Sequence, residues 1–453
     1  MPENRPRSSI ENIYHLEGRV PVARAIPYGL QHVLAMFVAN LTPITIIAAS
    51  ASIQGKELGF LMQNAMFIAG VATLLQLYPI WRIGSHLPIV MGVSFTFVTV
   101  LSTVAVNYGY PVVIGCVLTG GLLEGLIGLT LRRISHYIKP IVPAVVVCGI
   151  GLSLFTVGAR SFGGGYTEDY GSPQNLIVAT VTLLVSLVWM VLAKGPYRSL
   201  AVLVGLIVGY ILSLCLGMVD LTGIWDEGVV SFPHFLIFTP EFKLGPILSV
   251  FVIFLVSATE TIGDTSAMAI GGLRRPARDE EISGALVVDG FASSLSSLFG
   301  CPPVTSFSQN VGLIAMTRVV NRFTIMTGAV ILVLAGLFPP IGSFFASIPQ
   351  SVLGGCTIMM FGQILLAGMQ MLAGCGFTQK NITIASLALA IGVGTTASGE
   401  SDIWNHFPDI VQDIFKSNVV AVVFVIALLL SYILPENMGE DNPRNNKDKP
   451  KSE

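Results

Sequence analysis

The sequence predicts an all-α polytopic membrane protein, and its composition is the first reason. Of its 453 residues, 53% are hydrophobic and only 11% are charged, less than half the roughly 25% charged residues usual in soluble domains. A soluble fold could not bury this much apolar surface, and the same composition excludes disorder, collagen and coiled coils. The net charge of −2 gives no basic excess, so no nucleic-acid partner is expected.

The spacing of the apolar residues is the second reason. Runs of about 17–25 apolar residues are long enough to cross a bilayer as helices, and we count fourteen such segments, of which the third and tenth are weak. The third is rich in Ser and Thr, and the twelfth is broken by glycines and can be read as two. The predicted segments are 26–49, 58–80, 87–106, 111–130, 138–158, 175–193, 200–218, 246–270, 284–300, 304–317, 323–340, 346–372, 382–397 and 417–434.

The positions of Lys and Arg support this count independently of hydropathy. With both termini in the cytoplasm, twelve Lys and Arg residues fall in the predicted inner loops and four in the outer loops, as the positive-inside rule expects. The inner set is Arg82, Arg132, Arg133, Lys139, Lys194, Arg198, Arg274, Arg275, Arg278, Arg318, Arg322 and Lys380. The outer set is Lys56, Arg160, Lys243 and Lys416.

The N-terminal tail does not resemble a cleavable signal peptide. It carries Arg5, Arg7, Arg19 and Arg24 without the short apolar stretch that such a signal needs. We therefore expect it to be retained.

The cysteines are scattered and form no CxxC pair or Cys/His cluster, so neither a metal site nor a disulfide framework is expected. They are Cys116, Cys148, Cys215, Cys301, Cys356 and Cys375. No cofactor is expected.

Four acidic residues lie inside predicted segments: Glu124, Glu260, Asp264 and Asp289. A charge at bilayer depth costs at least ~2.5 kcal/mol on insertion scales, so such residues usually face a cavity and mark function. Three of the four lie in segments eight and nine, which makes this region the first candidate for a site. Glu124 is flanked by glycines, which favours a role in close helix packing.

Fourteen segments divide into two halves of seven, and an odd number per half gives the halves inverted orientations. Inverted repeats are typical of secondary transporters, whose sites lie where interrupted segments meet at the midplane. Segments three and ten are such a pair, because each is third in its half and polar around an aromatic residue, Phe95 or Phe307. Interrupted backbone at this depth is tolerable only beside a cavity.

One stretch resembles the signature of the nucleobase–ascorbate transporter family, also called nucleobase–cation symporter type two. The stretch is Gln309-Asn310-Val311-Gly312-Leu313-Ile314-Ala315-Met316-Thr317-Arg318. Three further features resemble that family in the expected order: the pair Gln31-His32, the run 258–264 (ATETIGD) and Asp289. The resemblance covers about residues 20–435 and is nearest to the xanthine and uric acid permease branch.

The resemblance implies a core domain, a gate domain, and short strands in segments three and ten. The core would slide against a fixed gate in an elevator-type mechanism, and the gates would form a homodimer. The implied division is an N-tail 1–25, core 26–135, gate 136–220, outer loop 221–245, core 246–342, gate 343–435 and C-tail 436–453, with both tails cytoplasmic.

Glu260 is the expected centre of the substrate site. A carboxylate can accept two N–H groups from a planar heterocycle, and a carboxyl group buried away from cations can exchange a proton near neutral pH. By family resemblance Gln309 binds the substrate directly, since its amide offers both a donor and an acceptor. Phe95 and Phe307 are expected to sandwich the ring. Ser94 stands at a position that the family uses for selectivity, and Ser308 lies beside Gln309.

Four residues are expected to support coupling. Asp264, one turn beyond Glu260, would tune Glu260 or hydrogen-bond the strand of segment three. Asp289 is a proton-coupling or core-organising group, both readings remaining open. His32 would fix the site by a hydrogen bond, with proton carriage as the alternative, and Asn310 would brace the site.

Thr317 and Arg318 end the signature. Arg318 is expected at the inner mouth, where it would attract an anionic substrate or act only as a positive-inside anchor.

The predicted function is proton-coupled uptake of an oxopurine, urate or xanthine, across the cell membrane, with Na⁺ as a possible coupling ion. A uracil or other nucleobase permease is the alternative. A channel would not need a buried Glu beside a Gln–Asn pair, an anion exchanger of related architecture would lack Glu260 and Gln309, and no nucleophile–base pair suggests an enzyme. The short loops resemble those of bacterial proteins.

Overall fold

The computed structural model describes residues 9–130, 139–221, 224–225, 228–396, 400–416, 418–436 and 438. The first eight residues and most of the predicted C-tail lie outside these ranges, as do Arg132 and Arg133 of a predicted inner loop.

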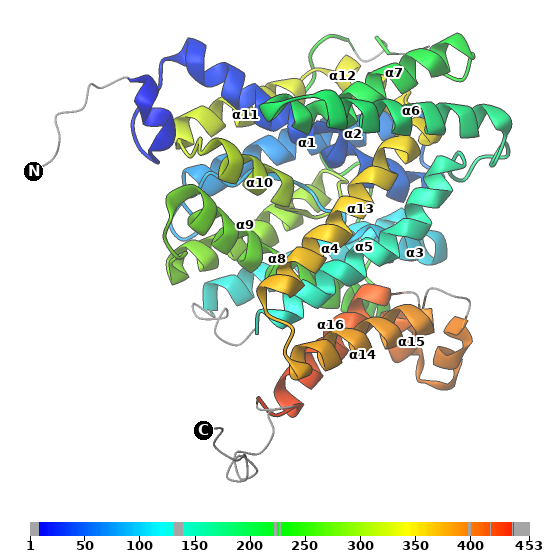
Figure 1. Cartoon of the computed structure of the whole chain (residues 1–453). Coiled ribbons are helices and arrows are strands. Elements are labelled where there is room, and N and C mark those ends of the chain that lie inside the picture. The colour runs from blue at the N-terminus through cyan, green and yellow to red at the C-terminus, as the bar shows by residue number, and fades with distance from the viewer. Residues whose placement is uncertain are drawn as a thin grey trace, which may run out of the picture.

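The described chain is built almost entirely of helices, as predicted (Figure 1). In chain order its elements are η1 (Ile10–Tyr14), α1 (Val22–Ser50), α2 (Gly55–Leu77), β1 (Met91–Val93), α3 (Val98–Tyr108), α4 (Tyr110–Thr130), α5 (Ile141–Phe162), α6 (Pro173–Leu192), η3 (Gly195–Leu200), α7 (Ala201–Cys215), α8 (Leu244–Leu273), α9 (Asp279–Leu298), β2 (Val304–Ser306), α10 (Ser308–Thr317), α11 (Arg322–Ala335), α12 (Pro339–Ala346), α13 (Gln350–Gly374), α14 (Gln379–Thr396), η4 (Glu400–His406), α15 (Asp409–Phe415) and α16 (Val419–Ile433).

Several of these helices are long and apolar enough to cross a membrane. Within the described ranges there are seven by length and composition: α1, α2, α4, α5, α6, α8 and α13. Two sharply bent pairs, α11 with α12 and α15 with α16, raise the number to nine if each pair is one span. The chain is therefore a multi-pass membrane protein, and the arrangement of fourteen inverted segments stays a prediction.

The predicted limits of segments eleven and twelve are wrong. The helix expected over 323–340 ends at Ala335, and α12 follows at an angle of 82° before α13 begins at Gln350. Proline at 339 and 340 explains the break, because proline disfavours helical backbone in the preceding residue and donates no backbone hydrogen bond. Close packing also fixes this corner, since a Cβ added at Gly336 would lie 2.6 Å from Phe67. The η4 and α15 helices have no counterpart among the predicted segments.

The strands expected in segments three and ten are present and pair with each other. β1 and β2 run antiparallel, with Met91 opposite Ser306, Gly92 opposite Thr305 and Val93 opposite Val304. The ladder continues at both ends, where Ser94 N donates to Pro303 O and Phe307 N donates to Val90 O, each at 2.9 Å. All six strand residues are buried, so this pairing satisfies backbone groups that neither water nor lipid could reach. A short helix follows each strand: α3 begins five residues after the end of β1, and α10 begins two residues after the end of β2.

Close helix crossings hold these interrupted segments in place. α4 packs along α9 through glycines: a Cβ at Gly121 would lie 2.6 Å from Gly290 O, and one at Gly290 would lie 2.1 Å from Gly125 N. Such small-residue contacts are typical of helix packing in membranes. In Figure 1, α14, α15 and α16 gather at the C-terminal end, away from α1, α2 and α11, while α13 runs beside α5 between them.

The N-terminal segment is bound to the loop that follows α10. Ile13 O accepts from Val320 N at 2.9 Å and from Asn321 N at 3.2 Å. The Asn321 side chain donates to His15 O at 3.0 Å and Gly18 O at 2.9 Å. Part of the predicted N-tail is thus a fixed element that holds the end of the signature helix.

Candidate functional site

The site is built where β1 and β2 meet α8 and α9, and Asp289 forms its base. Asp289 lies on α9 and is fully buried. Its Oδ2 accepts hydrogen bonds from the Thr305 hydroxyl at 3.0 Å and from the Thr261 hydroxyl, which lies close to it. The two hydroxyls are 3.2 Å apart. One carboxylate therefore ties α8 and α9 to the middle of β2.

Asp264 holds the other end of β2. Its Oδ2 accepts from Ser306 Oγ at 2.7 Å and from Ser308 Oγ at 2.9 Å, which are the last residue of the strand and the first residue of α10. Of the two roles expected for Asp264, a hydrogen bond to the strand of segment three is wrong, because its partners lie in segment ten. The Ser306 and Ser308 hydroxyls at this corner therefore both donate to Asp264, which lies one turn beyond Glu260.

Glu260 lies on the same helix but faces β1. It is half-buried, and Thr96 Oγ1 donates to its Oε2 at 2.7 Å. Thr96 is positioned by Ser94, whose hydroxyl accepts from the Thr96 N–H at 3.3 Å. Among the described residues Thr96 is the single side chain that hydrogen-bonds Glu260. A carboxylate has about four acceptor positions, so Glu260 can still accept from a ligand.

Asn310 and His32 connect α10 to α1. Asn310 Nδ2 lies 3.1 Å from both the backbone O and the Nδ1 of His32. Because the backbone oxygen can only accept, the amide nitrogen is the donor, and Nδ1 of a neutral His32 is then the acceptor that leaves its proton on Nε2. This geometry is consistent with a bracing role for both residues. The oxygen of the Asn310 amide and Nε2 of Gln31 are buried without a protein partner.

The two aromatic residues of the breaks have different surroundings. Phe307 lies against Gly92, since a Cβ at that glycine would be 2.6 Å from the Phe307 ring and 2.7 Å from Asn40 Oδ1. The same Asn40 oxygen accepts from Val93 N at 2.8 Å and so holds β1. Phe95 instead meets Phe361 of α13 edge-to-face, with the ring centroids 5.3 Å apart.

Gln309 opens into a cavity of about 510 Å³ bounded by α1, α6, α7, α10 and α13. Its lining is mainly apolar, with Met316 and Met360 among the residues, and Arg198 and Gln363 add polar groups. The described lining residues do not include Glu260. Gln309 and Glu260 are linked only indirectly. Gln309 follows Ser308, whose hydroxyl donates to Asp264, and Asp264 lies one turn from Glu260.

The structure does not bring Thr317 and Arg318 to the strands. Thr317 ends α10, and its hydroxyl donates to Leu313 O at 2.9 Å. Arg318 is exposed and ends the helix in the left-handed conformation, at φ +59°. They lie at the far end of the ten-residue helix α10, about 15 Å from its start beside β2 at the usual rise.

Glu124 is the fourth acidic residue of the predicted segments. It lies on α4, which packs against α9, and is buried with both carboxylate oxygens lacking a protein partner. Asp289 Oδ1 is likewise buried and unpartnered.

Sequence reasoning missed the hydroxyls that organise the site: Thr96, Thr261, Thr305 and Ser306. Thr96 lies in the Ser/Thr-rich third segment, and Thr261 directly follows Glu260. The richness of this region in Ser and Thr could have pointed to these residues, because a threonine hydroxyl at bilayer depth needs a hydrogen-bond acceptor. Which acid each one meets depends on the pairing of β1 with β2, which no local pattern encodes.

The site is acidic, and its acids have no counter-ion among the described residues. None of Glu260, Asp264 and Asp289 forms an ion pair within the described residues, where the ion pairs lie elsewhere. The described residues also contain no group of three or more His, Cys, Asp or Glu side chains that could hold a metal ion. Uncompensated buried carboxylates are costly, and a bound proton removes the charge.

Solved structures of low sequence identity share this fold. The transmembrane domain of a cyanobacterial bicarbonate transporter, BicA, matches with a TM-score of 0.54 at 15% identity, over 90% of this chain and 97% of that chain. The murine anion transporter Slc26a9, in its inward-facing state, matches with a TM-score of 0.56 at 11% identity, over 93% and 70%.

Comparison of sequences shows the family. The Permease family profile for xanthine and uric acid permeases matches residues 23–401. The xanthine permease XanQ of Escherichia coli (strain K12) is 33% identical over 447 residues, which is 95% of each chain. The uric acid transporter UacT of the same strain is 30% identical over 94% of this chain and 88% of its own. The xanthine permease of Bacillus subtilis (strain 168) is 30% identical over 90% and 93%. The chain therefore belongs to this permease family, the nucleobase–ascorbate transporters, and is a membrane transporter and not an enzyme.

Proposed function

We propose that the protein takes up an oxopurine, xanthine or urate, together with a proton across the cell membrane. The observation that carries this proposal is the arrangement at Glu260. Its carboxylate is half-buried where two strand–helix breaks meet, and Thr96 is its one side-chain partner among the described residues. The names of the relatives XanQ and UacT support an oxopurine as the substrate.

Glu260 and Gln309 can together select an oxopurine. Glu260 would accept two N–H groups from the ring, and Gln309 would match an N–H beside a carbonyl or ring nitrogen. A Glu at position 309 would suit a ring edge made only of N–H donors. A site built for a donor–acceptor pair rejects analogues that leave it unpaired. We therefore expect weak uracil transport, and Gln309→Glu should lower oxopurine uptake about tenfold or more, the cost of one unmatched polar contact.

Proton coupling would arise from the carboxyl groups of the site. Glu260, Asp264 and Asp289 have no ion-pair partner within the described residues. Asp264 and Asp289 each accept hydrogen bonds from two hydroxyl groups, whereas Glu260 accepts one, from Thr96. Hydrogen bonds to a carboxylate favour its ionised form, so we assign the exchangeable proton to Glu260. A bound substrate would stabilise one protonation state of Glu260 and so link the two fluxes.

The elevator mechanism rests on the way the helices group. α4 packs on α8 and α9, and α1 packs on α11, within the predicted core. α5 packs on α13 and α16, and α6 on α7, within the predicted gate. This grouping supports two bodies that slide against each other, with fourteen segments in two inverted halves and gate domains that form a homodimer. Both termini and the loop at Arg274–Arg278 are proposed to face the cytoplasm.

The proposed orientation is testable by labelling. A single cysteine placed at Pro276, in a background without the native cysteines, should react with an impermeant thiol reagent only after the cells are opened. A cysteine at Tyr170 should react in intact cells. Labelling of position 276 from outside would contradict the fourteen-segment arrangement.

The proposed function is testable with the purified protein in liposomes. Radiolabelled xanthine or urate should accumulate when the outside is acidic, and a protonophore should abolish accumulation. Uracil should compete weakly. Accumulation driven by a Na⁺ gradient and insensitive to the protonophore would overturn proton coupling. Efficient uracil uptake that neither xanthine nor urate inhibits would overturn the substrate assignment.

A further inference from the structure

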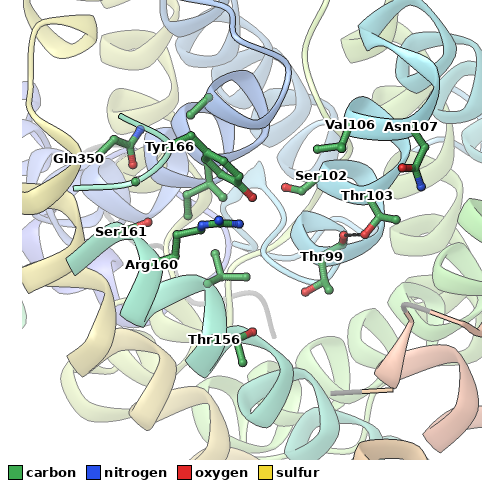
Figure 2. Close-up of a pocket in the computed structure, with 14 residues that line it drawn as sticks. Thr99, Ser102, Thr103, Val106, Asn107, Thr156, Arg160, Ser161, Tyr166 and Gln350 are labelled. Atoms are coloured by element: carbon green, nitrogen blue, oxygen red, sulfur yellow. Dashed lines mark hydrogen bonds between the residues drawn. The ribbon is translucent and has the colours of Figure 1, made fainter. Parts of the chain in front are cut away.

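A second polar pocket lies beyond the site on the predicted outer side of the molecule. It has a volume of about 350 Å³ and lies between α1, α3, α5 and α13 (Figure 2). This volume is within the range of pockets that hold small molecules. Its α3 residues begin with Thr99, one turn beyond Thr96, which donates to Glu260. The pocket therefore lies along the helix that leads outward from the proposed site.

Arg160 gives this pocket a positive charge. The guanidinium lies over the Tyr166 ring, 4.1 Å from its centroid, and both side chains border the pocket in Figure 2. Stacking occupies one face of the guanidinium and leaves the N–H donors along its edge free to bind. No carboxylate occurs among the described residues that line the pocket. The charge of Arg160 is therefore not neutralised by the walls of the pocket.

The facing wall supplies hydrogen-bonding groups. Ser102, Thr103 and Asn107 of α3 lie across from Arg160 and Tyr166 in Figure 2. Ser102 is nine-tenths buried, and its hydroxyl has no protein partner. An unpartnered buried hydroxyl is costly unless water or a ligand bonds to it. Cation, aromatic ring and polar wall together suit a planar anion that carries oxygen and nitrogen acceptors.

An aromatic contact is well placed to separate this pocket from the site. Phe95 lies one turn before Thr99 and meets Phe361 of α13 edge-to-face. A Cβ added at Gly158 of α5 would lie 2.9 Å from the Phe361 ring, which places that ring beside the α5 residues that line the pocket. The pocket is thus positioned to hold a molecule before it reaches Glu260.

We propose that the pocket between Arg160, Tyr166 and Ser102 is an outer binding site for a planar anionic heterocycle. Arg160 would pair with its delocalised charge in the plane of the ring, and Tyr166 would fix the orientation of the guanidinium. The inner site is acidic, so the outer site offers an anion the favourable charge that Glu260, Asp264 and Asp289 do not. This inference rests on the proposed function, with the ionised oxopurine, such as the urate monoanion, as the ligand.

Arg160→Gln tests the charge, with Lys243→Gln as its matched control. Lys243 also lies over an aromatic ring, 4.9 Å from the centroid of Tyr108, and belongs to the predicted outer loops, but it does not line the pocket. Uptake kinetics are measured at a pH at which urate is ionised and xanthine is largely neutral. Arg160→Gln should raise the KM for urate about tenfold, as expected for the loss of one charge-assisted hydrogen bond. In Arg160→Gln, the kcat for urate and the KM for xanthine should change less than about twofold. In Lys243→Gln, the kcat and KM for both substrates should also change less than about twofold, as for an exposed charge that contacts no ligand.

An equal effect of Arg160→Gln on both substrates, or of Lys243→Gln on urate, would overturn the outer site while leaving the proposed function standing. Absence of oxopurine uptake by the unmodified protein would instead overturn the proposed function itself.

A second measurement does not depend on the folding of the Arg160 variant. Asn107→Cys, in a background without the native cysteines, places a thiol in the pocket wall, and an impermeant reagent should label it from outside. Urate should slow this labelling even when Glu260 is replaced by Gln, because the outer site does not use Glu260. Loss of protection in the Glu260→Gln background, or no protection at all, would contradict binding in this pocket.

Discussion

The two strand–helix breaks look alike but are held differently. The β2–α10 break is fixed by two carboxylates: Asp289 accepts from Thr305 within the strand, and Asp264 accepts from Ser306 and Ser308 at its end. The β1–α3 break is fixed by an amide, since Asn40 Oδ1 accepts from Val93 N.

Within the described residues, the β1–α3 break hydrogen-bonds an acid only through Thr96, which donates to Glu260. Of the three acids at the site, Asp264 and Asp289 therefore hold hydroxyl groups of the β2–α10 break, and Glu260 is left with unused acceptor capacity. Position in the same acidic cluster does not give these residues the same task.

This difference explains why the break at β2 needs a side-chain acceptor. The N-terminus of α10 begins directly after the strand, and hydroxyl groups at Ser306 and Ser308 have no helical turn to bond to. Asp264 Oδ2 accepts from both hydroxyl groups and so holds this corner. Glu260 does not have this role, because Asn40 and Ser94 supply the acceptors that hold the β1–α3 break.

The largest contrast is expected between Thr305→Val and Thr96→Val, which delete the same hydroxyl at the two breaks. Thr305→Val removes one of the two donors to fully buried Asp289 and should lower the free energy of unfolding by about 1.5–3 kcal/mol. Thr96→Val should cost less than about 1 kcal/mol, because water can replace the hydroxyl at half-buried Glu260. Denaturation in detergent measures both. Equal losses would mean that the two breaks are held alike.

Gly92→Ala should disturb the site while leaving the fold intact. The new Cβ would lie 2.6 Å from the Phe307 ring and 2.7 Å from both Asn40 Oδ1 and the end of the Met36 side chain, all of which can shift. Overpacking of this kind costs about 1–3 kcal/mol, and here it would displace the acceptor of Val93 N, so uptake should fall about tenfold or more. Gly362→Ala is the control, since nothing lies within 4 Å of its added Cβ. Normal uptake by Gly92→Ala would show that Phe307 and Asn40 need not hold these positions.

The smallest effect is expected outside both breaks, at the C-terminal end of α16. Hydrogen bonds from Lys139 at 2.5 Å and from Lys380 at 3.1 Å hold the pKa of the Glu436 carboxyl below its usual value. The contribution of Glu436 to stability is therefore present above the pKa of the unfolded chain and is lost as the pH falls through the lower pKa of the folded state.

Glu436→Gln should remove this acid-dependent part of the melting temperature without changing transport at neutral pH. It thus separates acid effects on the fold from acid effects on Glu260. A melting profile below pH 5 that is unchanged by Glu436→Gln would contradict the assignment.

Many residues of the candidate site could be predicted from the sequence. The hydrogen-bond partners of those residues could not. Acids at bilayer depth pointed to Glu260, Asp264 and Asp289, and the polar residues around Phe95 and Phe307 marked the two breaks. Of the two roles expected for Asp264, the bond to the strand of segment three was wrong, because strands from the two halves of the chain pair across the site and local sequence does not record that register. Arg160 was read only as an outer charge, since its stacking on Tyr166 depends on a loop turn at Gly164 and Gly165.

The central claim is that Glu260 binds substrate and proton while Asp264 braces the strand. Binding of xanthine to the purified Glu260→Gln and Asp264→Asn proteins, followed by calorimetry between pH 5 and 8, tests it most directly. Asp264 uses one oxygen for both serines, so asparagine can keep those bonds. Asp264→Asn should therefore bind within about threefold of the unmodified protein and keep its pH dependence, as expected for a retained hydrogen-bond geometry. Glu260→Gln should bind about tenfold or more weakly, or bind without pH dependence. The account would be contradicted if Glu260→Gln bound xanthine with normal affinity and normal pH dependence while Asp264→Asn lost binding.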